Sequence, residues 1–290
     1  MKAAVFDLQR PATLDEALAL LQEHGGDARL LAGGQSLVPM LHMRLVQPAV
    51  VVDLERIEGL AGLSLEGDGV RIGAMTRYAA LERDALIAER LPLLATAMRC
   101  IGDRQVRNRG TIGGSLAQAD PLGEMPLICL ALDAAVILRS SDGERAVPID
   151  DFLLGAYTTE LEEDEMIVAV HVPFADRRCV LHEITRRHND FAVLALAATA
   201  VPSGDGSFAD VRVAIAGMDD RALLAEDAMR ELEGSGFEDD RCAQAASLCA
   251  AIGDPLSDVR ASADYRRQLA SVHGRRTFTR IRTAEGALGV

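Results

Sequence analysis

The chain has 290 residues and a hydrophobic content of 49%, values typical of a globular protein with more than one domain. Its formal net charge of −14 argues against nucleic acid as a partner, because phosphate binding depends on clustered Lys and Arg. No apolar run approaches the length of a membrane helix, and the N-terminal stretch lacks the pattern of a secretory signal. We therefore expect a cytoplasmic protein without a membrane span.

Two residue types exclude further classes of chemistry. Lys2 is the only lysine among the 30 Lys and Arg residues, so neither a Walker A loop nor a pyridoxal-phosphate Schiff base is available. The five cysteines form no C-x-x-C pair, whereas an iron–sulfur cluster needs about four thiolates, usually at short spacings. Neither a metalloprotease nor a serine-hydrolase motif occurs. We predict free thiols, no metal site and no catalytic acid or base.

The first part of the chain, residues 1–56, has the pattern of a small α/β unit. Thr13 and Glu16 form a capping box that opens a helix. Two short apolar strands are expected after this helix, at residues 29–32 and 50–54. The first of these strands leads directly into a glycine-rich loop.

The second part, residues 57–175, changes to a mixture of strands and helices. A hairpin is expected to turn at residues 67–69, and a polar run occupies residues 102–110 before the second glycine-rich turn. Periodicity predicts helices near residues 79–90, 92–101 and 124–132, and strands at residues 134–139 and 166–172.

A third part, residues 176–290, is expected to contain strands followed by helices. The pattern predicts strands near residues 180–187 and 211–216, and helices near residues 222–233, 239–251 and 265–282. The tail at residues 255–290 holds seven arginines. Two interpretations of this tail remain open: the solvated basic face of an amphipathic helix, or a docking surface for an acidic partner subunit.

Two loops of similar character carry the strongest functional signal. Residues 32–37 and residues 111–116 each pair two glycines with a small hydroxyl residue and a Leu. Glycines lack a Cβ, so successive N–H groups can converge into a nest that holds a pyrophosphate. Without a lysine, such loops suit a diphosphate that stays bound, as in a dinucleotide cofactor. Ordinary tight turns are the alternative, and neither loop matches the Rossmann pattern G-x-G-x-x-G.

Two carboxylates follow the second loop. Asp120 and Glu124 can accept hydrogen bonds from ribose hydroxyls, as acidic residues beside a nucleotide site commonly do. They can also cap the helix expected near Glu124, and both roles can hold at once.

Four segments of this chain resemble the medium, flavoprotein subunit of molybdenum hydroxylases, a family related to xanthine dehydrogenase. They are similar to the two FAD loops, to a third segment near the flavin and to a C-terminal signature, and they comprise residues 32–40, 107–117, 72–76 and 263–269 with Arg275 and Arg276. The resemblance spans essentially the whole chain. It implies an α+β fold with a two-part FAD-binding domain, made of a small α/β unit and a larger α+β unit, followed by a C-terminal antiparallel sheet with helices.

The resemblance also implies which residues bind FAD. Those facing the pyrophosphate would be Leu30, Leu31, Ala32, Gly33, Gly34, Gln35, Ser36 and Leu37, together with Thr111, Ile112, Gly113, Gly114 and Ser115. Glu124 would bind ribose with Asp120 nearby, and the residues lining the cofactor would be Ala74, Thr76, Ile101, Gly102 and Ile167. Phe191, in the segment Asn189–Ala192, stands where relatives often have a Tyr that can cover the isoalloxazine ring.

The function implied by the resemblance is electron transfer inside a larger complex. FAD on this chain would take electrons from the [2Fe-2S] clusters of a small subunit and pass them to an external acceptor. A large subunit would hold the molybdenum cofactor and hydroxylate the substrate, in a dimer of heterotrimers. The alternative is a stand-alone FAD-dependent oxidoreductase, which would need a general base or proton donor over the flavin.

Overall fold

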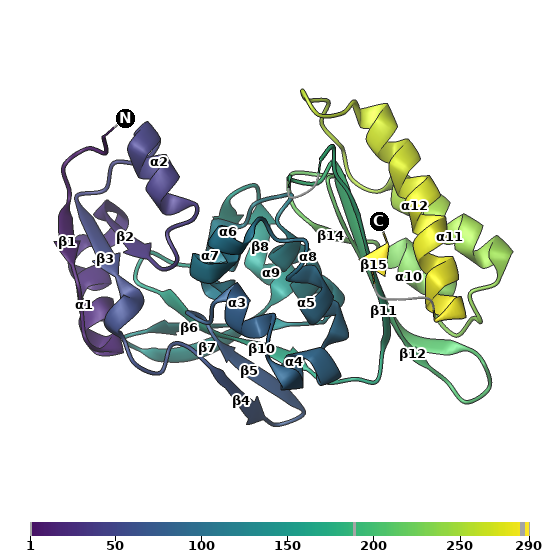
Figure 1. Ribbon diagram of the computed structural model, residues 1–290, viewed down its shortest axis with the longest axis horizontal. Coiled ribbons are helices and arrows are strands. Elements are labelled where there is room, and N and C mark those ends of the chain that lie inside the picture. Colours follow the sequence, from purple (N-terminus) through teal and green to yellow (C-terminus); the bar gives the residue numbers. More distant parts are fainter. Residues whose placement is uncertain (1, 188–189, 285–287, 290) are drawn as a thin grey trace.

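The computed structural model describes residues 2–187, 190–284 and 288–289 and has an α+β fold, as predicted. Three larger sheets follow one another from the N-terminal unit, at the left of Figure 1, to the C-terminal helices at the right. Asn189, at the start of the segment that carries Phe191, lies outside the described residues.

The N-terminal unit is a parallel sheet of three strands with a helix against it. In spatial order the strands are β1 (Asp7–Gln9), β3 (Val50–Asp53) and β2 (Ala28–Leu31). The predicted capping box opens α1 (Leu14–His24): the Thr13 hydroxyl accepts from the Glu16 N–H, and the Glu16 carboxylate accepts from the Thr13 N–H. The two predicted strands are confirmed to within one residue. Strand β1 was not predicted, because three residues carry no readable period.

The second unit is built on an antiparallel sheet of five strands. In spatial order these are β4 (Leu63–Glu66), β5 (Gly69–Gly73), β10 (Met166–Pro173), β6 (Ala135–Ser140) and β7 (Gly143–Pro148). The hairpin predicted at residues 67–69 is confirmed, since Glu66 pairs with Gly69 and Gly67 has a φ of +57°. A separate pair, β8 (Leu153–Gly155) and β9 (Thr158–Thr159), follows α9 (Ile149–Phe152).

Short helices of the second unit differ from the sequence prediction in two places. They are α3 (Tyr78–Leu81), α4 (Ala85–Arg90), α5 (Pro92–Ala97), α6 (Arg104–Arg109), α7 (Ile112–Gln118) and α8 (Glu124–Ala131). The single helix predicted over residues 79–90 is wrong: Asp84 accepts from the N–H groups of Leu86 and Ile87 and so starts a new helix. The polar run at residues 102–110, for which no helix was predicted, contains α6, and Asp103 caps this helix.

Helix α8 is buried along its length, from Met125 to Ala131. It packs against other helices of its own unit and also against three strands of the third sheet. A helix that is apolar all round belongs in an interior. The core of the second unit therefore continues into the C-terminal unit.

The C-terminal unit is a second sheet of five strands with three helices on one face (Figure 1). Its strands, in spatial order, are β14 (Leu223–Leu224), β13 (Phe208–Ala216), β12 (Leu194–Pro202), β11 (Arg178–Ile184) and β15 (Leu288–Gly289). All neighbours are antiparallel except β15, which is parallel to β11. The helices are α10 (Glu226–Leu232), α11 (Asp239–Ala251) and α12 (Ala263–Thr283).

The central strand β12 was not predicted. Its alternate residues Leu194 and Leu196 lie in the core under the helices, whereas Ala195 and Ala197 lie in the core shared with α8. Because both faces are buried, the strand shows no alternation of polar and apolar residues. It is also rich in Ala, which has a low preference for strands.

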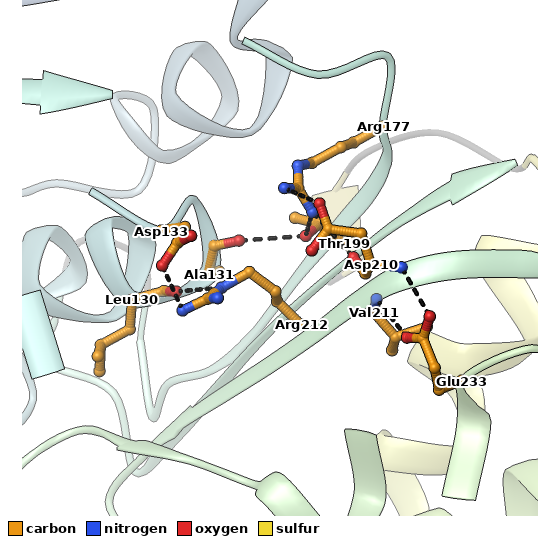
Figure 2. A network of polar contacts seen from close by, with 9 residues as sticks. All are labelled: Leu130, Ala131, Asp133, Arg177, Thr199, Asp210, Val211, Arg212 and Glu233. Carbon is orange, nitrogen blue, oxygen red and sulfur yellow. Dashed lines mark hydrogen bonds and ion pairs between the residues drawn. The ribbon is translucent and has the colours of Figure 1, made fainter. Parts of the chain in front are cut away.

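A polar network fixes the C-terminal sheet to the end of α8 (Figure 2). Arg212 Nε donates to the Leu130 carbonyl at 3.1 Å, and its guanidinium pairs with Asp133 at 3.0 Å. The buried Thr199 hydroxyl donates to the Ala131 carbonyl at 3.1 Å. These bonds satisfy carbonyl groups that a helix leaves free in its last turn, so the second and third units are joined by directional contacts as well as by packing.

The arginines of the C-terminal tail do not form one solvated face. Arg266 is buried and binds the Val193 carbonyl and the Asp258 carboxylate, while Arg267 donates to the Ala250 carbonyl. The simple amphipathic interpretation is therefore corrected for Arg266, because its guanidinium satisfies buried polar groups. A docking role for the exposed remainder of the tail stays a prediction.

Candidate cofactor site

The two glycine-rich loops lie against each other across the boundary between the first two units. The first loop, residues 32–36, joins β2 to α2 (Leu37–Met43), and the second begins α7. A Cβ built on Gly33 would lie 2.1 Å from the Arg109 carbonyl oxygen, and one built on Gly114 would lie 3.5 Å from the Ala32 Cβ. Gly33 is thus required by the close approach of a second backbone.

The first loop presents a run of unused donors. No described residue accepts a hydrogen bond from the N–H groups of residues 33–37, although the Gly34 and Ser36 carbonyls accept from Val38 and Met40. Gly34 has a φ of +73°, which turns the chain between strand and helix. Successive free N–H groups in such a turn form an anion-binding concavity. That these residues bind a diphosphate stays a prediction, which the free N–H groups support.

The second loop has a different form from the predicted nest. Its N–H groups are already used: Ile112 donates to the Thr76 carbonyl at 3.2 Å, Gly113 to the Ala74 carbonyl at 2.9 Å, and Gly114 to the Thr111 hydroxyl at 3.2 Å. Thr111 is the N-cap of α7, so this segment is the first turn of a helix rather than an open loop. The chain's own hydrogen bonds form this helix turn, and the turn lies against the first loop.

The predicted residues Ala74 and Thr76 hold this helix turn in place, because their carbonyls accept from its N–H groups. A Cβ on Gly113 would lie 2.6 Å from the Ala74 Cβ, so the helix turn fits only with a glycine at this position. Thr76 is buried, and its hydroxyl bonds the backbone of Gly62, accepting from its N–H at 2.9 Å. Both residues therefore contact the second loop directly.

An ion cluster strengthens the contact between the loops. Glu55, in the short helix η2 (Leu54–Arg56) of the first unit, pairs with Arg77 at 3.0 Å and with Arg109 at 3.5 Å. Glu55 and Arg77 also line a cavity of about 570 Å³ between the two units. Because all three side chains are about half exposed, the cluster orients the loops more than it stabilises the fold.

A second group of polar side chains lies where the second and third units meet. Glu124 begins α8 and is half-buried; burial, followed by the nearby Glu183 and Asp120 carboxylates, raises its pKa to about 8. Glu183 lies on β11, and burial raises its pKa too. Burial and Glu183 together raise the pKa of the Cys100 thiol to about 12.

The sequence analysis did not single out Glu183 or Cys100. The Oε1 atom of Glu183 is buried and has no hydrogen-bond partner among the described residues. An acidic side chain inside a strand expected to be buried was the available signal, because such groups are rarely placed there without a role.

Asp120 has a local structural role. Its carboxylate accepts from the Leu122 N–H at 2.9 Å and lies 3.4 Å from the Tyr157 hydroxyl. The N-cap of α8 is Gly123, so neither Asp120 nor Glu124 caps this helix as predicted. Asp120 instead forms a turn with the residue two positions on.

The remaining predicted residues lie around the two loops or at their edge. Leu30 and Leu31 end β2, and the buried Ile167 lies at an irregularity in β10. Ile101 and Gly102 accept from the Arg107 guanidinium through their carbonyls, at 3.1 and 2.8 Å.

Phe191 is on the surface. Its side chain is 49% exposed, and the Arg260 guanidinium lies 5.2 Å from its ring centroid. The structure thus places this aromatic next to a cation rather than in a core.

Other kinds of site find no support in the described part of the chain. Within residues 2–187, 190–284 and 288–289, no group of three or more His, Cys, Asp and Glu is placed to hold a metal ion. All five cysteines are free. No helix in these described ranges is long and apolar enough to cross a membrane.

The arrangement fits a dinucleotide. Five successive N–H donors suit a diphosphate, and Glu124 with the unpartnered oxygen of Glu183 can accept from hydroxyl groups. The turn that begins α7 lies against the first loop, and a larger residue at Gly113 would collide with Ala74.

Comparison with known proteins identifies the family of this chain. Residues 4–175 match the FAD binding domain in molybdopterin dehydrogenase, and residues 180–281 match the CO dehydrogenase flavoprotein C-terminal domain. The carbon monoxide dehydrogenase medium chain of Hydrogenophaga pseudoflava is 40% identical over 91% of this chain and 93% of its own length. The nicotine 6-hydroxylase medium subunit of Paenarthrobacter nicotinovorans is 38% identical over 96% of this chain and 98% of its own.

Solved structures agree with the sequence matches. A carbon monoxide dehydrogenase chain from Hydrogenophaga pseudoflava superposes with a TM-score of 0.94 at 39% identity, covering 97% of this chain and 98% of that chain. Quinoline 2-oxidoreductase from Pseudomonas putida 86 gives 0.93 at 35% identity, covering 98% and 99%. The predicted resemblance is confirmed: the chain belongs to the family of FAD-binding medium subunits of molybdenum-containing dehydrogenases and hydroxylases, which are oxidoreductases.

Proposed function

We propose that this chain holds FAD between its first two units and transfers electrons within a heteromeric molybdenum hydroxylase. The observation that carries the proposal is the run of five N–H groups at residues 33–37 that donate to no described residue, in a loop that lies against the turn at residues 111–115. A diphosphate bound there would receive main-chain hydrogen bonds and meet no lysine. A cofactor whose diphosphate is never hydrolysed needs no lysine at this site.

Each part of the site would have a separate task. The first loop would bind the pyrophosphate, and the turn that begins α7 would set the distance across it. Glu124, with Asp120 nearby, would accept from ribose hydroxyls, and Ile101, Gly102 and Ile167 would exclude water from the cofactor. When bound, FAD supplies the ability to take up single electrons and release a pair.

The electrons would come from partner chains. We propose that a small subunit with [2Fe-2S] clusters delivers them and that a large subunit with the molybdenum cofactor hydroxylates the substrate, in a dimer of heterotrimers. Support comes from the relatives, which are named medium chains or medium subunits and match along nearly their whole length. An external acceptor would then oxidise the flavin. A cytoplasmic location remains a prediction.

One observation favours a second candidate, a stand-alone FAD-dependent oxidoreductase. Burial raises the pKa of Glu124 to about 8, so this carboxyl can hold a proton near neutral pH. Such a group is the acid or base that a stand-alone flavoenzyme requires, and the sequence analysis found none.

Purification separates the two candidates. The chain would be isolated both with the subunits that accompany it in its source and alone, and flavin, iron, molybdenum and substrate turnover would be measured. We expect the isolated chain to carry FAD and to lack hydroxylase activity, which should appear only with both partners. Turnover of an organic substrate by the isolated chain, free of molybdenum and iron, would favour the stand-alone enzyme.

A further inference from the structure

Arg107 is the least exposed of the three arginines on α6. Its side chain is 15% exposed, whereas that of Arg109 is 49% exposed and Arg104 lies on the surface. A guanidinium carries five N–H donors and no acceptor, so a largely buried one must find its acceptors within the protein. The acceptors that Arg107 finds belong to two other segments of the second unit.

The guanidinium of Arg107 joins α6 to the chain on either side of it. Its Nε donates to the carboxylate of Glu82, directly after α3, at 3.2 Å. Its Nη1 donates to the carbonyls of Ile101 and Gly102, in the turn before α6, at 3.1 and 2.8 Å. No other described residue donates to either carbonyl. Arg107 alone therefore satisfies both carbonyls and holds this turn against its own helix.

The other end of α6 lies against the first glycine-rich loop. A Cβ built on Gly33 would lie 2.1 Å from the Arg109 carbonyl oxygen and 3.0 Å from the Gly110 Cα. Gly110 is itself fixed to α3, because its carbonyl accepts from the Tyr78 N–H at 3.0 Å. With six residues, α6 is only about 9 Å long. A shift of this short helix would therefore move the backbone on which the first loop rests.

We propose that Arg107 is a positioning residue for the cofactor: it fixes α6, and α6 sets the place of Arg109 and Gly110 against the first loop. The inference rests on the proposed function, since it assumes that the first loop binds the diphosphate of FAD. The same three bonds hold the turn at residues 101–102, which is expected to line the cofactor. The planar fork of arginine is needed, because Nε and Nη1 bind acceptors on different segments, whereas a lysine offers its donors from one nitrogen.

The test variants are Arg107→Lys and Arg107→Met, made in the full chain and freed of cofactor. Lys keeps the charge but cannot bind Glu82 and both carbonyls at once, and Met keeps only part of the stem. We expect the Kd for FAD to rise about tenfold in each, the change that follows the loss of one hydrogen bond to a charged group. The matched controls are Arg104→Lys and Arg104→Met. Arg104 lies on the same helix, and its side chain forms no hydrogen bond or ion pair with a described residue, so the Kd should stay unchanged.

Amide hydrogen exchange supplies a readout that a purely stabilising role would not move. With FAD bound, the amides of residues 33–37 become accessible when the cofactor leaves, so at a fixed excess of FAD their exchange rate follows the Kd. Exchange there should be about tenfold faster in Arg107→Lys than in the wild type, and unchanged in Arg104→Lys. A residue that only stabilised the fold would lower the unfolding free energy of the cofactor-free chain and leave this rate at its wild-type value.

The outcomes separate this proposal from the proposed function. Thermal unfolding of the cofactor-free proteins checks that the variants fold. A wild-type Kd and wild-type exchange in folded Arg107→Lys would overturn the role of Arg107 and leave FAD binding intact. If Arg107→Lys does not fold, Glu82→Gln decides, because it weakens one bond and leaves both carbonyl bonds in place. A Kd raised about threefold in this variant supports the proposal, and a wild-type Kd overturns it. A wild-type chain that binds no FAD would instead refute the proposed function.

Discussion

Replacing Gly33 by Ala tests the contact between the two loops. The new Cβ would lie 2.1 Å from the Arg109 carbonyl oxygen and 3.0 Å from the Gly110 Cα. Ordinary contact begins at 3.4 Å, so the loops must separate by about 1.3 Å. The obstacle is backbone rather than a flexible side chain, and overpacking of this kind costs about 1–3 kcal/mol. The free N–H groups of the first loop would then no longer face the turn that begins α7.

The assay for this variant is the flavin content of the purified chain, measured by absorbance, together with denaturant unfolding of the cofactor-free form. We expect Gly33→Ala to lose most of its FAD and to unfold at a lower denaturant concentration. Gly204→Ala is the matched control, because no atom lies within 4 Å of its added Cβ and its φ is not positive. Full flavin content and unchanged unfolding in Gly33→Ala would refute the assigned contact.

Three further changes test other parts of the structure. Phe191→Ala should alter flavin fluorescence and the reoxidation rate of reduced flavin, whereas Phe191→Tyr should alter them less. Identical spectra of the wild type and both variants would place the Phe191 ring away from the cofactor. Because burial raises the pKa of Glu124 from an ordinary 4.5 to about 8, the folded chain holds a proton at this site that the unfolded chain has lost between these two values. The unfolding free energy of the cofactor-free chain should therefore fall as the pH rises from 4.5 to about 8 and level off above it, and a rise over this range would contradict the assignment. Arg212→Ala should lower the unfolding free energy by about 1–3 kcal/mol, since the Leu130 carbonyl loses one of its donors and Asp133 loses its ion pair. The exposed Arg230→Ala should change it by less than about 0.5 kcal/mol in the same denaturant experiment.

Sequence patterns predicted the elements whose signals are local. The capping box of α1, the hairpin at residues 67–69 and the bounds of α11 all agree with the structure. Each depends on residues close together in the chain, such as Thr13 with Glu16. Strand β12 was not predicted, because its burial on both faces depends on α8 and on three later helices. No local period in the sequence reveals these contacts.

The cofactor site was predicted unevenly for the same reason. The glycines were visible in the sequence, but whether their N–H groups stay free depends on distant partners: Ala74 and Thr76 occupy those of the second loop, and none occupy those of the first in the described structure. Glu183 approaches Glu124 only because β11 packs against α5, so its proximity to Glu124 is a property of the tertiary fold.

The unequal use of N–H groups in the two loops has a consequence for maturation of the protein. Amide protons at residues 112–115 are held by Ala74, Thr76 and Thr111 whether or not a cofactor is bound, so they should exchange slowly with solvent in the empty chain. Those at residues 33–37 have no such protection and should exchange rapidly until a diphosphate arrives. Cofactor binding should then protect the amides of this one short segment. The flavin can therefore be added to an already folded subunit as a late step, and removed and restored without unfolding it.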